Sequence, residues 1–248
     1  MRWLILSDIH SNMEALHAVL GAGAREYDQV LCLGDVVGYG PDPNLVVEWV
    51  RENVRACVRG NHDKVACGID DASQCTYEAR VAALWTRGQL TPNNLQYLER
   101  LPQGPMCIQT FQIVHGSIGD EDRYIVTQPD AWEEFRNLAT ELVFFGHTHH
   151  QGGYFLDVTD SLHELKPSFF RGCSRVALEL LPGEKYLLNP GSVGQPRDGD
   201  NRAAFAIYDA ERQQLEYWRV PYNVEATQIR MEECDLPAAL IQRLSFGH

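Results

Sequence analysis

Residues 3–10 of the chain, Trp3-Leu4-Ile5-Leu6-Ser7-Asp8-Ile9-His10, place two potential metal ligands directly after a short apolar run. Four consecutive apolar residues bounded by polar ones are typical of a buried strand. The same arrangement recurs along the first 150 residues. Five apolar runs of this kind are predicted to be strands, at residues 3–6, 30–33, 56–58, 113–114 and 142–145. Each of them ends in a side chain that can bind a divalent metal ion.

Helix signals fill the segments between these runs. Asn12 precedes an apolar stripe, and Asp42-Pro43 and Thr91-Pro92 each combine an N-cap residue with a proline at the first helical position. Helices are therefore predicted over residues 13–24, 43–54, 76–87, 93–100 and 131–139, the last with Asp130 as its N-cap. Strands that alternate with helices favour a layered α/β fold.

The pattern changes after residue 150. Turn signals such as Pro182-Gly183 separate short apolar stretches, as in antiparallel strands. These strands are expected at residues 154–158, 175–180, 186–188, 203–208 and 215–220. No polar linker divides the chain, so we expect one domain over residues 1–248, with residues 222–248 as a helical extension packed on it. Two alternatives stay open for this extension: a cap on the sheet, or a contact between copies in a homo-oligomer.

Charge and composition exclude several kinds of partner. The 248 residues carry 21 basic and 34 acidic side chains, hence a net charge of −13, and no basic run that would bind a long nucleic acid. A short phosphate ligand held by metal ions stays compatible with this charge. No apolar stretch approaches the roughly 20 residues of a membrane span. The seven cysteines form no C-x-x-C motif, which predicts reduced thiols in a cytoplasmic protein.

The polar residues that follow the five apolar runs are all metal-ligand types. They are Asp8, His10, Asp35, Asn61, His115, His147 and His149. Ligands of open α/β sheets bind at the carboxyl ends of the strands, so we expect these loops to converge on one edge of the sheet. In Asp8-x-His10 and His147-x-His149, the spacing of two residues puts both side chains on the same side of an extended segment.

Seven nitrogen and oxygen ligands without a thiolate exceed the four of a structural zinc site. They fit two metal ions, with Asp35 as the shared carboxylate. Mixed donors suit manganese, our first expectation, and also iron, zinc, nickel or cobalt, better than magnesium or calcium. Two such ions about 3.5–4 Å apart can activate a bridging water and stabilise both oxygens of an in-line displacement at phosphorus.

The motifs D-x-H, G-D, G-N-H-D, H-G and G-H-T-H follow one another between Asp8 and His149. In this order they resemble the calcineurin-like metallophosphoesterase superfamily. The resemblance implies a four-layer αββα sandwich, two mostly mixed β-sheets flanked by helices, with the dinuclear site at one edge. It also implies that one metal is held by Asp8, His10, Asp35 and His149, and the other by Asp35, Asn61, His115 and His147. By the same match, His62 is a catalytic residue above the substrate phosphate, where it stabilises charge or protonates the leaving oxygen.

One departure from the family concerns its second motif, which reads G-D-V-V-G-Y-G at residues 34–40. In the phospho-Ser/Thr phosphatase branch this motif is G-D-x-x-D-R-G. The aspartate that partners the catalytic histidine and the arginine that grips phosphate are therefore both missing here. This disfavours a protein phosphatase, and it leaves Asp63 or a water to orient His62.

Residues 38–44 and 189–197 resemble a bacterial branch of the superfamily that contains small phosphodiesterases and dinucleoside polyphosphate hydrolases. Tyr39, Arg197, Arg123 and Tyr124 are predicted substrate contacts, since arginine can bind phosphate in a bidentate manner and an aromatic ring can stack on a base. The lone cysteines and the remaining histidines are interpreted as packing or surface residues.

These observations predict a phosphodiesterase with two divalent metal ions that cleaves a small phosphodiester or nucleotide by attack of a metal-activated hydroxide, without a covalent intermediate. A dinucleoside polyphosphate hydrolase of the diadenosine tetraphosphate type is the main alternative. A phosphomonoesterase would share every metal ligand but should offer more cationic groups. A metal-binding interaction module without catalysis is the alternative from another class, and the complete ligand set with His62 argues against it.

Overall fold

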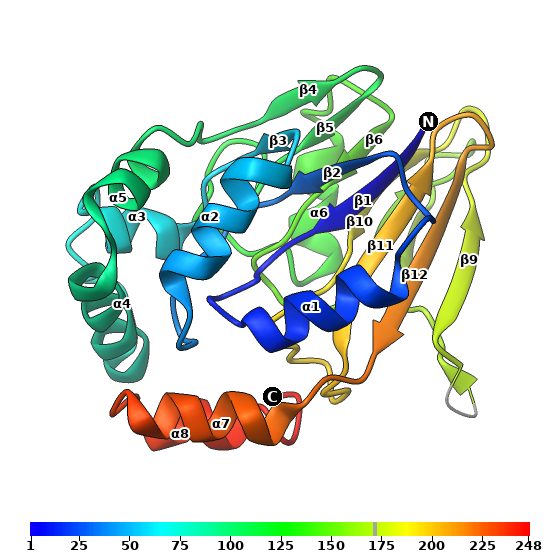
Figure 1. The fold of residues 1–248 in the computed structure, drawn as a ribbon. Helices are drawn as coiled ribbons and strands as arrows, with labels where there is room; N and C mark the ends of the chain where they lie inside the picture. Colours follow the sequence, from blue (N-terminus) through cyan, green and yellow to red (C-terminus); the bar gives the residue numbers. More distant parts are fainter. Residues whose placement is uncertain (171–172) are drawn as a thin grey trace.

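Two β-sheets of six strands each form the centre of the molecule, which is shown as a computed structural model in Figure 1 and is described over residues 1–170 and 173–248. The first sheet has the order β3 (Ala56–Cys57), β2 (Gln29–Cys32), β1 (Arg2–Leu6), β11 (Ala203–Asp209), β12 (Gln214–Val220), β9 (Arg175–Glu179). The second has the order β4 (Met106–Ile108), β5 (Phe111–Ile113), β6 (Leu142–Phe144), β10 (Lys185–Asn189), β7 (Gly152–Leu156), β8 (Leu162–Leu165). Both sheets are mixed, because parallel and antiparallel pairs occur in each.

Eight helices accompany the sheets in the part of the chain that the structure describes. They are α1 (Met13–Ala22), α2 (Pro43–Asn53), α3 (Asn61–Cys67), α4 (Tyr77–Gln89), α5 (Pro92–Glu99), α6 (Gln128–Phe135), α7 (Val224–Glu233) and α8 (Ala238–Arg243). Figure 1 shows α1 and α2 in front of the first sheet and α6 behind the second. The expected α/β architecture of two mixed sheets with flanking helices is therefore confirmed.

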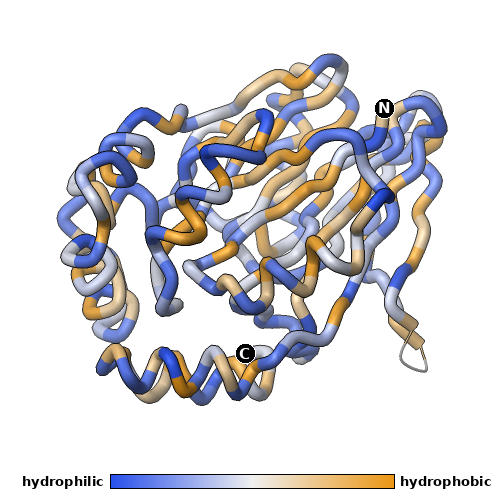
Figure 2. Tube along the Cα trace, viewed as in Figure 1, coloured by the Kyte–Doolittle hydropathy of each residue, from blue (hydrophilic) through white to orange (hydrophobic). Residues whose placement is uncertain are grey.

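Alternation of side chains along β1 explains the layers. Leu4 and Leu6 face a core shared with α1 and α2, whereas Trp3 and Ile5 face a second core that lies between the two sheets. A third core joins the outer face of the second sheet to α6. Successive side chains of a strand point to opposite faces, so a strand that is apolar on both faces must be covered on both sides. Figure 2 shows these hydrophobic stretches along the strands, with hydrophilic segments at the turns.

The structure corrects several details of the sequence interpretation. Helix α6 starts after Thr127, whose hydroxyl caps the helix, and not after Asp130, which is the third residue of a capping box. Asp42 precedes α2 as expected, but its side chain makes no cap hydrogen bond. Strand β10 pairs parallel with β6, although an antiparallel partner was expected on every side. Strands β4 and β8 and helix α3 were not predicted, because each is short and has little apolar periodicity.

The C-terminal extension packs along one end of the sandwich. Helices α7 and α8 share an apolar cluster with α4 and with Tyr39, and Figure 1 shows them beside the end of α4. The guanidinium of Arg230 on α7 holds the carboxylate of Asp42, with Nη1 at 2.8 Å from Oδ2. The extension therefore reaches across to the loop that precedes α2. Among the described residues, no helix has the length and apolar character needed to cross a membrane.

Candidate dinuclear metal centre

The loops that follow β1, β2, β3, β5 and β6 bring the predicted ligands together at one end of the sandwich. Three of these strands belong to the first sheet and two to the second, so the site spans the seam between the sheets. The expectation that the five loops converge on the edge of one sheet was therefore too simple. Two clusters of ligand atoms result, and both include Asp35.

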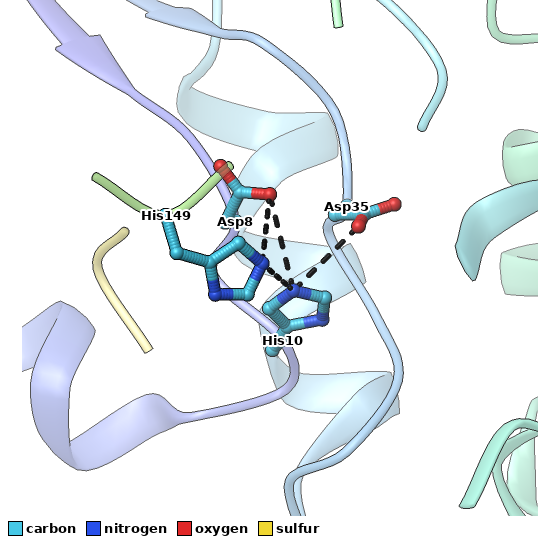
Figure 3. A group of neighbouring side chains, drawn as sticks. All are labelled: Asp8, His10, Asp35 and His149. Atoms are coloured by element: carbon cyan, nitrogen blue, oxygen red, sulfur yellow. Dashed lines mark hydrogen bonds and ion pairs between the residues drawn. The ribbon is translucent and has the colours of Figure 1, made fainter. Parts of the chain in front are cut away.

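The first cluster contains Asp8, His10, Asp35 and His149, all of them buried (Figure 3). The Nε2 atoms of His10 and His149 lie 3.0 Å apart. His149 Nε2 is 3.3 Å from Asp8 Oδ1, and His10 Nε2 is 3.6 Å from Asp35 Oδ2. Two ring nitrogens and two carboxylate oxygens thus converge on one point, as the ligands of a single cation do.

The second cluster contains Asp35, His115 and His147. The same Asp35 Oδ2 that faces His10 is 3.5 Å from His115 Nε2. Asn61, which the sequence analysis adds to this group, has its Oδ1 at 3.3 Å from His115 Nε2. One carboxylate oxygen therefore lies between the two clusters, in the position of a ligand shared by two ions.

The four histidines are held by their other ring nitrogens. Backbone carbonyl oxygens accept a hydrogen bond from each of them, so those nitrogens carry the proton and the opposite nitrogens present a lone pair to the site. The pairs are His10 Nδ1 to Val37 at 3.0 Å, His115 Nδ1 to Leu33 at 2.8 Å, His149 Nδ1 to Gln195 at 2.5 Å, and His147 Nε2 to Asp122 at 3.0 Å. This orientation is the one that metal-binding imidazoles have.

The ligand atoms of the two clusters have the chemistry that divalent cations require. Asp8 Oδ1 and Asp35 Oδ2 are buried and have no hydrogen-bond partner among the described residues. Burial of an unpaired carboxylate oxygen is unfavourable unless a cation binds to it. Mixed imidazole, carboxylate and amide donors suit manganese, iron, zinc, cobalt or nickel. The buried Asp/His clusters thus suit divalent metal ions, and the residues that would hold them are those that the motifs indicate.

Burial and neighbouring charges shift the pKa values of the clustered residues. Burial lowers the pKa of His147 to about 3 and also lowers the pKa of His10, so both rings are neutral at pH 7. Burial would lower the pKa of His115 too, but the charge of Asp35 outweighs it and raises that pKa to about 10. Without a cation this ring would therefore carry a second proton on Nε2, which a metal ion would have to displace. Burial opposes ionisation of Asp8, yet the facing His149 holds the pKa of that carboxyl below its usual value.

The local backbone at the ligands is unusual. Asp8, His10, Asp35, His147 and His149 all have φ between 49° and 66°, a left-handed conformation that is uncommon for residues other than glycine. The predicted extended geometry of the two pairs is therefore wrong, because the segments coil tightly around the site. Backbone strain of this kind persists only where the surroundings enforce it, and it gathers at functional sites.

Two glycines of the motifs allow the ligand-bearing loops to approach one another closely. A Cβ at Gly60 would lie 2.1 Å from Asp35 Oδ1, and one at Gly146 would lie 2.0 Å from Ser7 Oγ. Neither position can therefore hold a side chain without displacing the carboxylate or the loop that carries Asp8.

His62 lies beside the clusters without belonging to either. Its backbone N–H donates to Asp35 Oδ1 at 2.9 Å, and its ring packs against the rings of His10 and Tyr39, with centroids 4.9 and 4.3 Å away. Asp63 does not orient this ring as suggested, because its two carboxylate oxygens accept backbone N–H groups from Val37 and Gly60. Burial lowers the pKa of His62 to about 4, and its Nδ1 has no partner among residues 1–170 and 173–248.

A cavity of about 410 Å³ opens in front of the site, with Asn61, His62 and His147 in its wall. Three of the predicted substrate contacts line it, namely Tyr39, Tyr124 and Arg197. The Tyr124 ring stacks on that of His147 at 3.8 Å, and Arg197 Nη2 is 3.2 Å from the Tyr39 hydroxyl.

Arg123 is placed differently from the sequence interpretation. It is not among the residues that line the cavity, because its half-exposed guanidinium pairs with Glu133 at 2.6 Å on the outer surface. The next residue of the loop, Tyr124, faces the site instead.

Two further residues of the cavity wall, Arg243 and His248, were missed by the sequence analysis. Both belong to the C-terminal extension, far in sequence from every motif. Nothing in the local sequence marks them, because they reach the site only through the packing of α7 and α8.

A sandwich of two mixed sheets, with one carboxylate shared by two clusters of aspartate and histidine ligands beneath a cavity, defines a class of metal-dependent phosphoesterases. The sequence model of the calcineurin-like phosphoesterase superfamily domain matches residues 1–213. The chain belongs to this family.

Similar proteins cover the whole chain. The uncharacterized protein MJ0912 of Methanocaldococcus jannaschii is 34% identical over 98% of this chain and 97% of its own. The crystal structure of a metallophosphoesterase from Sphaerobacter thermophilus is 39% identical and has a TM-score of 0.86 over 100% of this chain and 99% of its own. The hypothetical protein PH1004 of Pyrococcus horikoshii shares the fold at 20% identity, with a TM-score of 0.78 over 100% and 98% of the two chains.

Proposed function

We propose that this protein is a metal-dependent phosphodiesterase that hydrolyses a small phosphodiester or nucleotide. One observation carries the proposal: Asp35 lies between two ligand clusters, and the open cavity in front of them has His62 in its wall. The family supports hydrolysis of phosphoric esters. The preference for a diester is supported by the motif at residues 34–40, which lacks the aspartate and the phosphate-gripping arginine of the phospho-Ser/Thr phosphatase branch.

The metal ions would be held by the residues that the two clusters contain, with Asn61 added to the second. Two bound divalent ions, manganese in the first place, would activate water for attack on phosphorus and neutralise the phosphate oxygens. The chain itself does three things. Its backbone carbonyls fix the histidine rings, Tyr39 and Gly38 pack around His62, and the cavity admits the ester.

His62 is proposed as the catalytic residue next to the leaving oxygen. Its ring lies in the cavity wall and packs against the rings of His10 and Tyr39, and its backbone N–H is bound to the shared carboxylate of Asp35. From this position the imidazole would stabilise charge on the leaving oxygen or protonate it. Protonation requires that the bound, negatively charged substrate raise the pKa of His62 above its value of about 4. A positioned acid–base group contributes about 10²–10⁴-fold to the rate.

A test of this function starts from protein stripped of metal and reloaded with Mn²⁺, Ni²⁺, Zn²⁺ or Mg²⁺. Bis-p-nitrophenyl phosphate and p-nitrophenyl phosphate are offered in parallel. We expect metal-dependent cleavage of the diester, with the monoester a poor substrate. His62→Ala should keep its metal content and lose turnover by about 100-fold or more. His17→Ala is the matched control, because His17 is exposed on α1 away from the site.

Three outcomes would contradict the proposal. Preference for the monoester would indicate a phosphomonoesterase. Normal turnover of His62→Ala would exclude its catalytic role. Two tightly bound metals without turnover of any ester would favour an interaction module without catalysis.

A dinucleoside polyphosphate hydrolase is a second candidate. It is favoured by the combination of aromatic rings, Tyr39 and Tyr124, with Arg197 and Arg243 in one cavity.

We also propose that the protein works in the cytoplasm, since all seven cysteines are free thiols and such thiols persist in reducing compartments.

A further inference from the structure

We propose that Arg197 and Arg243 form a second anion-binding subsite beside the metal centre, and that the substrate carries a second phosphate group joined to the one that reacts. This inference rests on the proposed function, since the reacting phosphate must bind at the two clusters. It adds to that function a residue of the C-terminal extension and a class of substrate, namely phosphoesters or phosphoanhydrides with more than one phosphate.

The two guanidinium groups converge on one neutral oxygen. Arg197 Nη2 lies 3.1 Å from Gln195 Oε1, and Arg243 Nη1 lies 3.4 Å from the same atom. Both arginines line the cavity that contains His62. An amide oxygen can accept both hydrogen bonds, but it carries no charge that would compensate the two cations.

No carboxylate among the described residues lies within ion-pair distance of either arginine. Two other poorly exposed arginines of this acidic chain have a carboxylate partner: Arg59 pairs with Glu121 and Arg219 with Asp198. A third, Arg87, instead donates hydrogen bonds to the backbone carbonyls of Val65, Ala66 and Asp70. In addition, Arg197 Nε is buried without a hydrogen-bond partner in the described structure. Two neighbouring cations with an unused donor are unfavourable in isolation, and an anion such as phosphate would satisfy both.

The acidic residues of the same cavity do not fill this role. Asp70 and Asp122 line the cavity as well, but the Asp122 carboxylate pairs with Lys64 at 2.5 Å. Asp70 Oδ1 accepts the backbone N–H of Ala72 at 2.9 Å. The pKa of Arg243 responds to its surroundings accordingly: burial and the nearby Arg197 lower it from its ordinary value. Burial would lower the pKa of Arg197 as well, but Tyr39, Tyr124 and the charge of Asp8 outweigh it and raise that pKa. No described carboxylate pairs directly with either guanidinium, so both keep donors for an anionic ligand.

The subsite lies next to the catalytic groups and not elsewhere on the surface. Arg197 donates to the Tyr39 hydroxyl, and the Tyr39 ring is 4.5 Å from the ring of His10 and 4.3 Å from that of His62. A single aromatic ring thus lies between Arg197 and the first ligand cluster. A phosphate attached directly to the reacting phosphate would extend along this ring toward Arg243.

The fold fixes Arg243 in this place. It ends α8, which packs through Leu240 and Ile241 into the apolar cluster shared with Tyr39 and α4. The carbonyl of Gly247 accepts the N–H of Gly199 at 2.9 Å, which ties the extension to the loop that carries Arg197. The family model ends at residue 213, so this half of the subsite comes from a segment outside the matched domain.

The test compares Arg243→Gln with wild type on diadenosine tetraphosphate, which has adjacent phosphates, and on bis-p-nitrophenyl phosphate, which has one. We expect the ratio of kcat/KM for the tetraphosphate to that for the diester to fall about 10- to 100-fold, the effect of losing charge-assisted hydrogen bonds. Arg212→Gln is the matched control, because Arg212 is 79% exposed on the β11–β12 turn, and its ratio should equal that of wild type. Arg243→Lys, which keeps the charge without the planar fork, should give an intermediate ratio.

A binding measurement separates failure of the subsite from failure of the proposed function. Methylenebisphosphonate and methylphosphonate are titrated by calorimetry into metal-loaded protein freed of excess metal. In Arg243→Gln, the ratio of the affinity for methylenebisphosphonate to that for methylphosphonate should fall about 10-fold or more. An unchanged preference and an unchanged kcat/KM ratio, in a variant that unfolds at the wild-type temperature, would overturn the subsite. Loss of the preference in a protein that hydrolyses neither ester would support the subsite and reject the proposed function.

Discussion

The substitution Gly38→Ala is expected to displace His62 while it leaves the metal ligands in place. Gly38 has a φ of 93°, and a Cβ built on it would lie 2.6 Å from Nδ1, 3.0 Å from Cγ and 3.1 Å from Cβ of His62. The three nearest atoms all belong to that one residue. Ordinary contacts to a Cβ begin at 3.4 Å, so the imidazole ring must shift by roughly 1 Å, and such a misplacement can cost about 100-fold in rate.

The assay follows hydrolysis of bis-p-nitrophenyl phosphate by metal-loaded Gly38→Ala, together with its metal content and unfolding temperature. We expect kcat/KM to fall about 100-fold with two ions retained. The left-handed backbone should also destabilise the folded state by about 1–2 kcal/mol, because an alanine does not favour this conformation.

Gly183→Ala provides the matched control for backbone strain. Its φ is 82°, and the nearest atom to a Cβ there is Val158 Cγ1 at an ordinary 3.5 Å, in a turn away from the site. This variant should show a similar loss of stability with normal turnover. Wild-type turnover of Gly38→Ala would refute the reasoning, because the position of His62 would then not matter. Loss of metal from Gly38→Ala would also refute it, because the clash would have reached the ligands.

Two further predictions concern the shared ligand and pH. Asp35→Asn should bind at most one ion per chain, since Asp35 Oδ2 faces both His10 and His115, and metal analysis that still finds two ions would exclude the shared position. Burial opposes ionisation of Asp200, but hydrogen bonds from Arg202 outweigh it and hold the pKa of Asp200 below its ordinary 3.8. This stabilisation is complete above pH 3.8 and is lost as pH falls through the lower folded pKa. The difference in unfolding temperature between wild type and Asp200→Asn should therefore narrow in that acidic window, and a constant difference would contradict it.

Much of the candidate metal site could be predicted, because the residues that cluster there follow strands directly. A strand of four apolar residues has little freedom in its direction, so Asp8 and Asp35 must emerge at the ends of β1 and β2, which are parallel neighbours in the first sheet. His115 and His147 emerge in the same way after β5 and β6 in the second sheet. The position of each ligand directly after a strand was therefore enough to predict that the ligands lie close together, even though the packing of the two sheets was not known.

The conformation of these loops could not be predicted in the same way. The left-handed backbone at His147 and His149 depends on contacts from other parts of the chain, such as the Gln195 carbonyl that binds His149. Arg123 and Tyr124 are adjacent in sequence and chemically plausible as substrate contacts, yet the pairing of Arg123 with Glu133 turns it outward. Side-chain direction in a loop is decided by such partners and not by local pattern.

The sequence by itself determined the family, the α/β class and the seven residues offered as metal ligands, because these depend on local runs and on the order of motifs. Only the tertiary structure decided that Asp35 lies between two clusters, that Gly38 and Tyr39 surround His62, and that Arg243 joins Arg197 in the cavity. The reason is physical. These contacts join segments up to about 200 residues apart, and the packing of α8 against Tyr39 and α4, which brings Arg243 to the site, is a property of the folded chain as a whole.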